Sequence, residues 1–547
     1  MTDQASDAPA VTTTAPGAAG EQPAVRGLRT ETIAPGATEV HAPMRDRIKL
    51  AGNLYLPEGD GPFPCIVTRT PYGKDTMELF SDPRAARKYT KAGYAYLVQD
   101  TRGKGRSEGH YGGFTDDRND GYDTVEWMAQ QSWCNGKIGV TGASAMGITT
   151  NMAAIANPPH LVAAFVIVAG NDTAFIGGAF KQRDMGDWNR GQGVRSSAAS
   201  YVATALSVTG DVLHNARFIH IPIYNYGGWY DLFSVGNVRN FQHLQNHGSR
   251  GARGNQKLEM GPFGHGEMTG DLAYPNGSEL LRGATDEIRW FDHWLKGVDN
   301  GIMHEPPVRI YMMASARKGE LSPKNRWMRF ANWPPAPQIA HYYLHQDASL
   351  SRKTPTEAQA SRTYDFDPAN PVPTHGGSNL TFEKGPMDQR SIGERPDYLR
   401  FQTAVLERDV AIAGPVSLEL WASTDGPDTD FMVKLVDVYP DGYEAIVLDS
   451  ALRTRYRHGR NRDDVAMMTP GAPEKLTLDL WDTAITFEQG HKIAVHVTSS
   501  NSPRFDVNPN TGGLPGRDVE TRVARNTIYF DAAHPSAILL PVIYPDG

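Results

Sequence analysis

Cysteine is nearly absent from this 547-residue chain, which holds only Cys65 and Cys134. A framework of disulfides is therefore excluded, and a metal site made of several thiolates is not expected. Long apolar runs are also missing, since no stretch reaches the roughly 18 residues that a membrane-spanning helix needs. The N-terminus lacks the basic and then apolar pattern of a secretion signal, so we predict a cytoplasmic protein.

An excess of charge of either sign is missing as well. The chain has 54 Lys and Arg against 62 Asp and Glu, which gives a formal net charge of -8. This balance provides no basic surface for nucleic acid or for an anionic membrane. We therefore expect a small-molecule substrate as the partner, no nucleic acid and no membrane, and the composition is compatible with a homo-oligomer.

The most informative local pattern is KIGVTGASAMG at residues 137–147. A run with β-branched residues leads into a turn of small residues with Ser144 at its centre, and residues 148–156 are good helix formers. This pattern predicts a strand, a sharp turn and a helix, which is the local shape of a nucleophile elbow. Small neighbours matter because a serine on so tight a turn has strained backbone angles. Alone the motif is weak, since small-residue turns between strands and helices are common.

Over the first part of the chain, short apolar runs typical of buried strands alternate with segments whose apolar residues recur at helical spacing. This order is typical of an α/β fold with a doubly wound sheet. After about residue 325, apolar residues instead recur at every second position, as at Val416, Leu418 and Leu420. That period predicts an antiparallel β-sandwich. We expect buried strands at 63–68, 94–98, 161–168, 218–224 and 258–260, and helices at 120–131 and 285–295.

These patterns divide the chain into parts. Residues 1–26 are rich in Ala, Thr, Pro and Gly and are predicted to be a disordered tail. The α/β domain takes residues 27–171 and 217–325, and residues 326–547 form an all-β domain of jelly-roll type. Residues 172–216 interrupt the α/β domain after the elbow, where a short cap over a pocket would lie. The alternative for this insertion is a surface excursion with no role in the site.

Two later stretches each carry a polar residue directly after an apolar strand. YGGWYD ends in Asp231, and MGPFGHG contains His265. Separately each is ordinary, because an Asp at a strand end is more often a helix cap and a loop His is more often solvated. With Ser144 they follow the chain order Ser, Asp, His, and each comes just past a strand, at the edge where doubly wound sheets bind ligands.

The chemistry of these residues is complementary. A serine hydroxyl is a poor nucleophile at neutral pH and needs a base that titrates near neutrality, as histidine does. We therefore predict Ser144 as the nucleophile, His265 as the base and Asp231 as the acid that fixes the tautomer of the imidazole. The backbone N–H of Ala145 is expected to be one oxyanion donor. This mechanism needs no cofactor, and we predict none.

Further motifs, together with those above, carry a family resemblance. They are TPYGK at 70–74, DTRGKGRSEG at 100–109, GPMDQR at 385–390 and IAGP at 412–415. The set resembles the CocE/NonD hydrolases, which are related to the X-Pro dipeptidyl-peptidases of family S15. The resemblance implies an enzyme, a serine esterase or acylase with an α/β-hydrolase domain and a C-terminal jelly roll. It also implies that the Tyr72 hydroxyl is the second oxyanion donor and that Asp100 and Arg102 brace the loops beneath the site.

The chain departs from this family around the pocket. Ala145 stands where a tyrosine usually follows the nucleophile, and the acidic residues that bind a substrate ammonium in the α-amino acid ester hydrolases are missing after Asp231. Phe233 suits an apolar acyl group, and the alternative for this residue is a place in the core. We place Phe233, Trp229 and Met146 in the substrate pocket.

We therefore predict a serine hydrolase that cleaves carboxylic esters, and amides as further substrates, through an acyl-enzyme. Three alternatives remain open. The first is an acylase that removes an amide side chain, as from a β-lactam nucleus. The second is an X-Pro dipeptidyl-peptidase, although the ammonium anchor and the long N-terminal domain of that group are missing. The third, from another class, is an inactive protein that binds ligands through its jelly roll.

Overall fold

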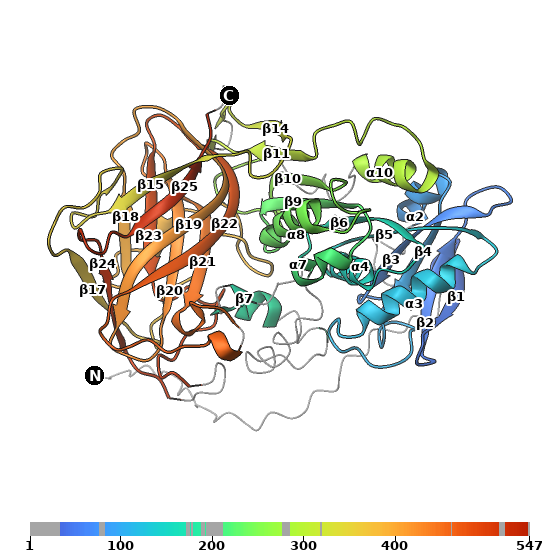
Figure 1. Cartoon of the computed structure of the whole chain (residues 1–547), viewed down its shortest axis with the longest axis horizontal. Coiled ribbons are helices and arrows are strands. Elements are labelled where there is room, and N and C mark those ends of the chain that lie inside the picture. Colours follow the sequence, from blue (N-terminus) through green and yellow to red (C-terminus); the bar gives the residue numbers. More distant parts are fainter. Residues whose placement is uncertain are drawn as a thin grey trace, which may run out of the picture.

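The computed structural model describes residues 33–75, 83–170, 175–176, 179–186, 192, 212–275, 285–317, 320–460, 462–513 and 520–544. The predicted tail at 1–26 and the predicted helical part of the insertion near 196–208 lie outside these ranges. An α/β unit, blue to green, and a β unit, yellow to red, lie side by side (Figure 1). The change of pattern along the sequence therefore corresponds to a change of architecture.

The α/β domain is built on one ten-stranded mixed sheet. Its strands in spatial order are β1 (Thr38–Pro43), β2 (Lys49–Tyr55), β4 (Ala95–Asp100), β3 (Phe63–Thr70), β5 (Cys134–Ala143), β6 (Leu161–Ile167), β9 (Ile223–Tyr230), β10 (Lys257–Gly264), β11 (Val308–Met312) and β14 (Arg326–Phe330). The strands from β4 to β11 are parallel, whereas β1, β2 and β14 pair antiparallel at the two edges. All parallel strands therefore end at one edge.

Helices cover both faces of this sheet, which is why its central strands are almost wholly apolar and buried. The apolar side chains of α10, such as Phe291, pack on one face together with those of α2, and Leu244 of α8 packs on the other with residues of α3 and α4. The helices are α2 (Pro83–Lys91), α3 (Asp117–Ala129), α4 (Ala145–Ala156), α8 (Ser234–His247) and α10 (Thr285–Lys296).

The sheet differs from the prediction at two places. β11 and β14 extend it beyond β10, so the sheet continues to Phe330 and the predicted domain boundary at residue 325 falls inside it. β9 begins at Ile223 and not at Phe218, which lies in the short helix η3 (Ala216–Phe218) with half of its surface exposed. Pro222 has no N–H to donate to the ladder, which explains the later start.

The C-terminal domain consists of two antiparallel sheets, one of seven strands and one of four. The predicted period of two is confirmed at the start of β22, where Leu476, Leu478 and Leu480 are buried and Lys475, Thr477 and Asp479 are exposed. Both sheets contribute to one apolar cluster, so they pack face to face. The jelly-roll type of its connections stays a prediction.

The strands of the larger sheet are β16 (Leu350–Ser351), β15 (Gln338–Leu344), β25 (Ala537–Val542), β19 (Val410–Thr424), β24 (Ala524–Tyr529), β17 (Ser361–Phe366) and β22 (Glu474–Phe487), which pairs with β19. Those of the smaller sheet are β18 (Tyr398–Gln402), β23 (Lys492–Thr498), β20 (Asp430–Val438) and β21 (Glu444–Arg453). The short elements are β7 (Phe175–Ile176), β8 (Ala179–Phe180), η1 (Gln182–Gly186), α7 (Val212–Asn215), β12 (Ala316–Arg317), β13 (Glu320–Leu321), η4 (Gln389–Ile392), η5 (Thr454–Tyr456) and η6 (Arg462–Asp464).

The two domains share a continuous apolar core. Trp229 of β9 packs against Trp333, with ring centroids 5.7 Å apart. Trp333 Nε1 donates to Asp482 of the β domain at 2.7 Å, and burial raises the pKa of Asp482 to about 6. The backbone N–H of Met313 donates to Ala484 at 3.0 Å. The C-terminal domain is thus packed directly onto the α/β domain.

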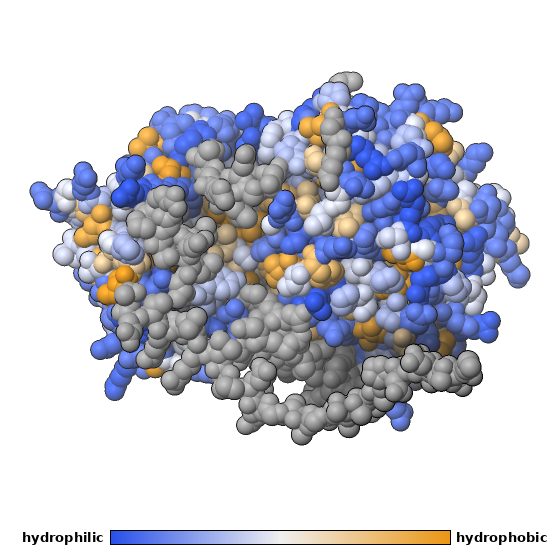
Figure 2. Space-filling view, turned by 180° about the vertical axis from the view of Figure 1, so that it is seen from behind, coloured by the Kyte–Doolittle hydropathy of each residue, from blue (hydrophilic) through white to orange (hydrophobic). Residues whose placement is uncertain are grey.

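The described surface is mixed in character. Seen from behind, its apolar residues lie in small groups among hydrophilic ones (Figure 2). Within the described ranges, none of the helices combines the length and the apolar character that crossing a bilayer requires.

Candidate active site

Ser144 stands on a sharp turn between β5 and α4, as predicted. Its φ of 56° and ψ of -123° are unusual for an L-residue and lift the side chain out of the turn. A Cβ at Gly142 would lie 2.5 Å from the carbonyl carbon of Met146, and one at Gly147 would lie 2.5 Å from the Cβ of Ala169. The turn therefore requires the small residues of the motif.

Three side chains from three strand ends meet at this turn. His265 Nε2 lies 2.9 Å from Ser144 Oγ, and His265 Nδ1 donates to Asp231 Oδ2 at 2.7 Å. Asp231 is fully buried, His265 keeps 14% of its side chain exposed, and Ser144 is half-buried. This arrangement allows a proton to pass from Ser144 to His265 while the buried carboxylate stabilises the imidazolium.

Asp231 directly follows β9 and is fixed by its own turn. Its Oδ1 accepts the N–H of Phe233 at 2.7 Å, and its N–H donates to the carbonyl of Gly228 at 3.1 Å. A Cβ at Gly228 would lie 2.2 Å from the carbonyl oxygen of Phe263 in β10. The glycine thus lets β9 and β10 approach each other where they carry Asp231 and His265.

The two predicted oxyanion donors lie at the ends of neighbouring strands. Tyr72 comes two residues after β3, Ser144 comes one residue after β5, and these strands pair in parallel. Ala145 is the first residue of α4, where a backbone N–H has no acceptor within the helix. Tyr72 is half-buried and packs against the apolar cluster that contains Met146. The donor roles of Ala145 and Tyr72 stay predictions.

Asp100 ties the loop that carries Tyr72 to the loop after β4. Its Oδ1 accepts the N–H of Lys74 at 2.5 Å, and its Oδ2 accepts the N–H of Arg106 at 2.9 Å. Burial raises the pKa of Asp100 to about 7. Gly105 lies so close that a Cβ there would be 2.1 Å from Asp100 Oδ2. Asp100 therefore braces the loops beneath the site, as the resemblance implies.

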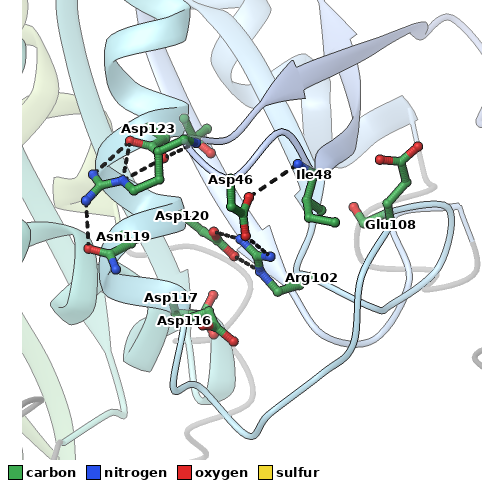
Figure 3. A network of polar contacts seen from close by, with 12 residues as sticks. Asp46, Ile48, Arg102, Glu108, Asp116, Asp117, Asn119, Asp120 and Asp123 are labelled. Atoms are coloured by element: carbon green, nitrogen blue, oxygen red, sulfur yellow. Dashed lines mark hydrogen bonds and ion pairs between the residues drawn. The ribbon is translucent and has the colours of Figure 1, made fainter.

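Arg102 lies in a network of polar contacts with Asp46 and Asp120 (Figure 3). Its guanidinium donates to Asp120 of α3 at 3.0 and 2.6 Å, and to Asp46 at 2.5 Å. Arg45 binds Asp123 of the same helix at 3.0 and 2.8 Å. This network joins the β1–β2 turn, the loop after β4 and α3. The bracing of loops beneath the site by Arg102 stays a prediction.

The three residues predicted to line the substrate pocket lie in different surroundings. The Phe233 ring stands edge-on to the imidazole of His265, with ring centroids 5.5 Å apart. Met146 is buried directly after the turn. The prediction is wrong for Trp229, which is only 1% exposed and donates through Nε1 to the carbonyl of Tyr311 at 2.9 Å. The β domain covers this side chain, so a substrate cannot reach it.

Sequence reasoning missed several residues around Phe233. The described part of the insertion and a loop of the β domain both pack against it, and the residues that do so are Phe180, Met185 and Leu380. Isolated apolar residues in loops form no motif, so no sequence signal marked them. Lys384, from the same loop of the β domain, donates through Nζ to the carbonyl of His265 at 3.1 Å.

Two family models match the chain. The model of the X-Pro dipeptidyl-peptidase (S15 family) matches residues 46–209. The model of the X-Pro dipeptidyl-peptidase C-terminal non-catalytic domain matches residues 300–539. The first match includes the turn with Ser144, and the second includes the β domain.

Known relatives extend over both domains. Cocaine esterase of Rhodococcus sp. strain MB1 Bresler is 30% identical over 585 residues, which cover 93% of this chain and 98% of that protein. A solved α-amino acid ester hydrolase is 27% identical with a TM-score of 0.77 and covers 95% of this chain and 99% of its own. A solved aminopeptidase from the marine sediment archaeon Thaumarchaeota archaeon is 25% identical with a TM-score of 0.78, at 94% and 98% coverage. The chain therefore belongs to the CocE/NonD family and is a hydrolytic enzyme of the serine hydrolase type.

Proposed function

We propose that the enzyme hydrolyses carboxylic esters of small molecules through an acyl-enzyme formed on Ser144. The observation that carries this proposal is the hydrogen-bonded line from Ser144 through His265 to buried Asp231, with distances of 2.9 and 2.7 Å. The similarity to a cocaine esterase along nearly the whole chain supports the same class of reaction.

In the proposed mechanism, His265 takes the proton of the Ser144 hydroxyl as Oγ attacks the ester carbonyl. The negative charge that develops on the carbonyl oxygen is stabilised by the N–H of Ala145 and the hydroxyl of Tyr72. His265 then gives its proton to the leaving alcohol, and the acyl group stays on Ser144. A water molecule, deprotonated by His265, releases the acid and restores the serine.

The surroundings of the triad favour an apolar acyl group. Phe233 lies against the imidazole and belongs to a small apolar cluster with Phe180 and Met185 of the insertion. The residues after Asp231 are Leu232, Phe233 and Ser234, all buried and uncharged. An ammonium group would find no counter-charge among them, so a neutral ester is preferred to an α-amino ester.

Cleavage of amides or peptides is the second candidate, because the S15 model matches the catalytic half and a similar structure is named an aminopeptidase. The same residues would serve, but His265 must protonate a more basic amine leaving group. Acylase activity belongs to this candidate. The uncharged run after Asp231 disfavours an X-Pro dipeptidyl-peptidase, since such a substrate carries a free ammonium.

The test compares the wild type with Ser144→Ala on a p-nitrophenyl ester and on the matched p-nitroanilide. We expect the ester to be turned over faster than the anilide, and the substitution to lower kcat on both by about 10⁴-fold or more. Circular dichroism and thermal melting should show an unchanged fold. Retained ester turnover by Ser144→Ala would contradict the proposal, and a faster anilide would favour the second candidate.

A further inference from the structure

A loop of the C-terminal domain reaches the residue proposed as the catalytic base. Lys384 lies on the long connection between β17 and β18, and its Nζ donates to the carbonyl oxygen of His265 at 3.1 Å. The same Nζ donates to the carbonyl of Leu380 at 2.8 Å. One ammonium group therefore joins the backbone of His265 to the backbone of a different domain.

The backbone of Lys384 holds the same segment at a second point. The N–H of Thr269 donates to the carbonyl of Lys384 at 3.0 Å, and the N–H of Lys384 donates to Thr269 Oγ1 at 3.3 Å. Residues 265–269 are thus fixed at both ends by one residue. The ring of Phe233 packs on His265, and Leu380 adjoins the cluster of Phe233, so the imidazole is also supported from the side.

The loop that presents Lys384 is itself rigidly built. Gly377 and Gly385 exchange two backbone hydrogen bonds of 2.9 Å and close the loop. Inside it, the side chain of Asn379 donates to the carbonyls of Gly376 and Glu383 at 2.8 and 2.7 Å. Such a closed loop can transmit a fixed position to Lys384.

The loop is anchored on both of its flanks. Arg504, fully buried in the β domain, donates through Nη1 to Asn379 Oδ1 at 3.0 Å. Asp184 of the insertion accepts the N–H groups of Leu380 and Thr381 at 2.9 and 3.1 Å. The β domain and the insertion therefore hold the loop between them.

Burial makes the charged form of Lys384 less favourable than it would be in water. Burial lowers the pKa of Lys384, while the carboxylates of Asp184 and Asp231 act in the opposite direction. A neutral donor could make the same hydrogen bonds without this penalty. A cation here has one effect that a neutral group lacks. When His265 takes a proton it becomes positively charged, and the positive charge of Lys384 repels it.

We propose that Lys384 is a positioning residue that holds His265 Nε2 toward Ser144 from the C-terminal domain. The inference rests on the proposed function, because it assumes that His265 is the base. It assigns to a domain whose family model is described as non-catalytic a direct part in the geometry of the active site. The domain is then required for turnover as well as for stability.

The test replaces Lys384 by Met, which keeps the length of the side chain and removes its donors and charge. We expect kcat on the p-nitrophenyl ester to fall about 10- to 100-fold, because a small displacement of a catalytic group costs that much. KM should stay within about threefold, since Lys384 does not contact the substrate in this account. The midpoint of the pH profile of kcat/KM should move upward by about half a pH unit as the nearby cation is lost.

Two further variants separate positioning from general damage. Lys384→Arg, which keeps the charge and the donors, should recover most of kcat. Lys475→Met is the matched control, because Lys475 is an exposed lysine on β22 of the same domain with an ion pair to Glu419, and it should behave as the wild type. Combining Lys384→Met with Asp231→Asn should cost less than the product of the single effects, since both act through His265.

Each outcome decides the inference. A kcat of Lys384→Met within twofold of the wild type, or an unchanged pH midpoint with KM as the parameter that moves, overturns it. If Lys384→Met melts at a much lower temperature, Lys384→Gln, which keeps a donor without the charge, is measured in its place. Its kcat should fall less than that of Lys384→Met while the pH midpoint still moves upward, and an unchanged midpoint overturns the inference. If Ser144→Ala is inactive while the Lys384 variants match the wild type, only the positioning role fails. If Ser144→Ala retains turnover, the proposed function itself fails.

Discussion

His265 Nε2 lies 2.9 Å from Ser144 Oγ, although 121 residues separate them in the chain. Both residues directly follow parallel strands of one sheet, β10 and β5, so both lie at the edge where those strands end. The pair can exchange a proton only when the imidazole is neutral, and the activity should therefore depend on pH.

We expect kcat/KM on a neutral ester to rise with pH between about 5 and 8 and then to level off. The cause is that protonated imidazole cannot accept the proton of Ser144. Initial rates at substrate concentrations well below KM, in buffers of constant ionic strength, measure this profile. A flat profile over that range would speak against a histidine base.

Tyr72→Phe should lower kcat by about 10²- to 10³-fold, because one donor to the developing oxyanion is lost. KM should change little, since the substrate carbonyl gains most from this donor in the transition state. The measurement is steady-state kinetics on the p-nitrophenyl ester. A kcat within twofold of the wild type would remove Tyr72 from the oxyanion site.

Gly105→Ala should displace Asp100, because the added Cβ would lie 2.1 Å from its Oδ2. Asp100 holds the loop that carries Tyr72, so we expect kcat to fall about tenfold and the melting temperature to decrease. Gly93→Ala is the matched control, since Gly93 also has a positive φ but no atom within 4 Å of the added Cβ. Equal kcat in the two variants would show that backbone strain alone is responsible.

Asp482→Asn should make the stability of the folded protein depend less on pH. Burial raises the pKa of Asp482 from 3.8 to about 6 in the folded state, so its contribution to stability is present below pH 3.8 and is lost as pH rises through 6. The loss amounts to about 3 kcal/mol at full ionisation. Asparagine keeps an acceptor for the indole N–H of Trp333 and does not ionise.

Melting temperatures at pH 4.5 and 7.5 test this point. The difference between Asp482→Asn and the wild type should grow in favour of the variant by a few degrees at the higher pH. Asp365→Asn, at an exposed position of β17 in the same domain, serves as the control and should show no such growth. A constant difference for Asp482→Asn would mean that the carboxyl ionises in the fold as it does in the unfolded chain.

Much of the site follows from local sequence. A serine between glycines at a strand-to-helix junction predicts a strained turn. The structure explains the glycines, because a Cβ at Gly142 or Gly147 would lie less than 3 Å from neighbouring atoms. Asp231 and His265 could be associated with Ser144 because each ends a strand of one parallel sheet, and parallel strands bring their ends together.

Features that depend on packing between the two domains could not be predicted from local sequence. Trp229 is an aromatic residue two positions before Asp231, and only the position of Trp333 shows that the β domain covers it. β14 (Arg326–Phe330) follows the point where the predicted β domain begins, yet it pairs with β11 of the first sheet. Lys384 has no sequence signal, because its partner is a backbone carbonyl 119 residues away.

The most direct test of the central claim is covalent labelling with a fluorophosphonate probe, followed by peptide mass spectrometry. An activated serine attacks the probe's phosphorus, and an ordinary serine does not. The account predicts one label per chain, located on Ser144, and no label in the Ser144→Ala protein. A wild-type protein that remains unlabelled, or one labelled at another residue, would contradict it.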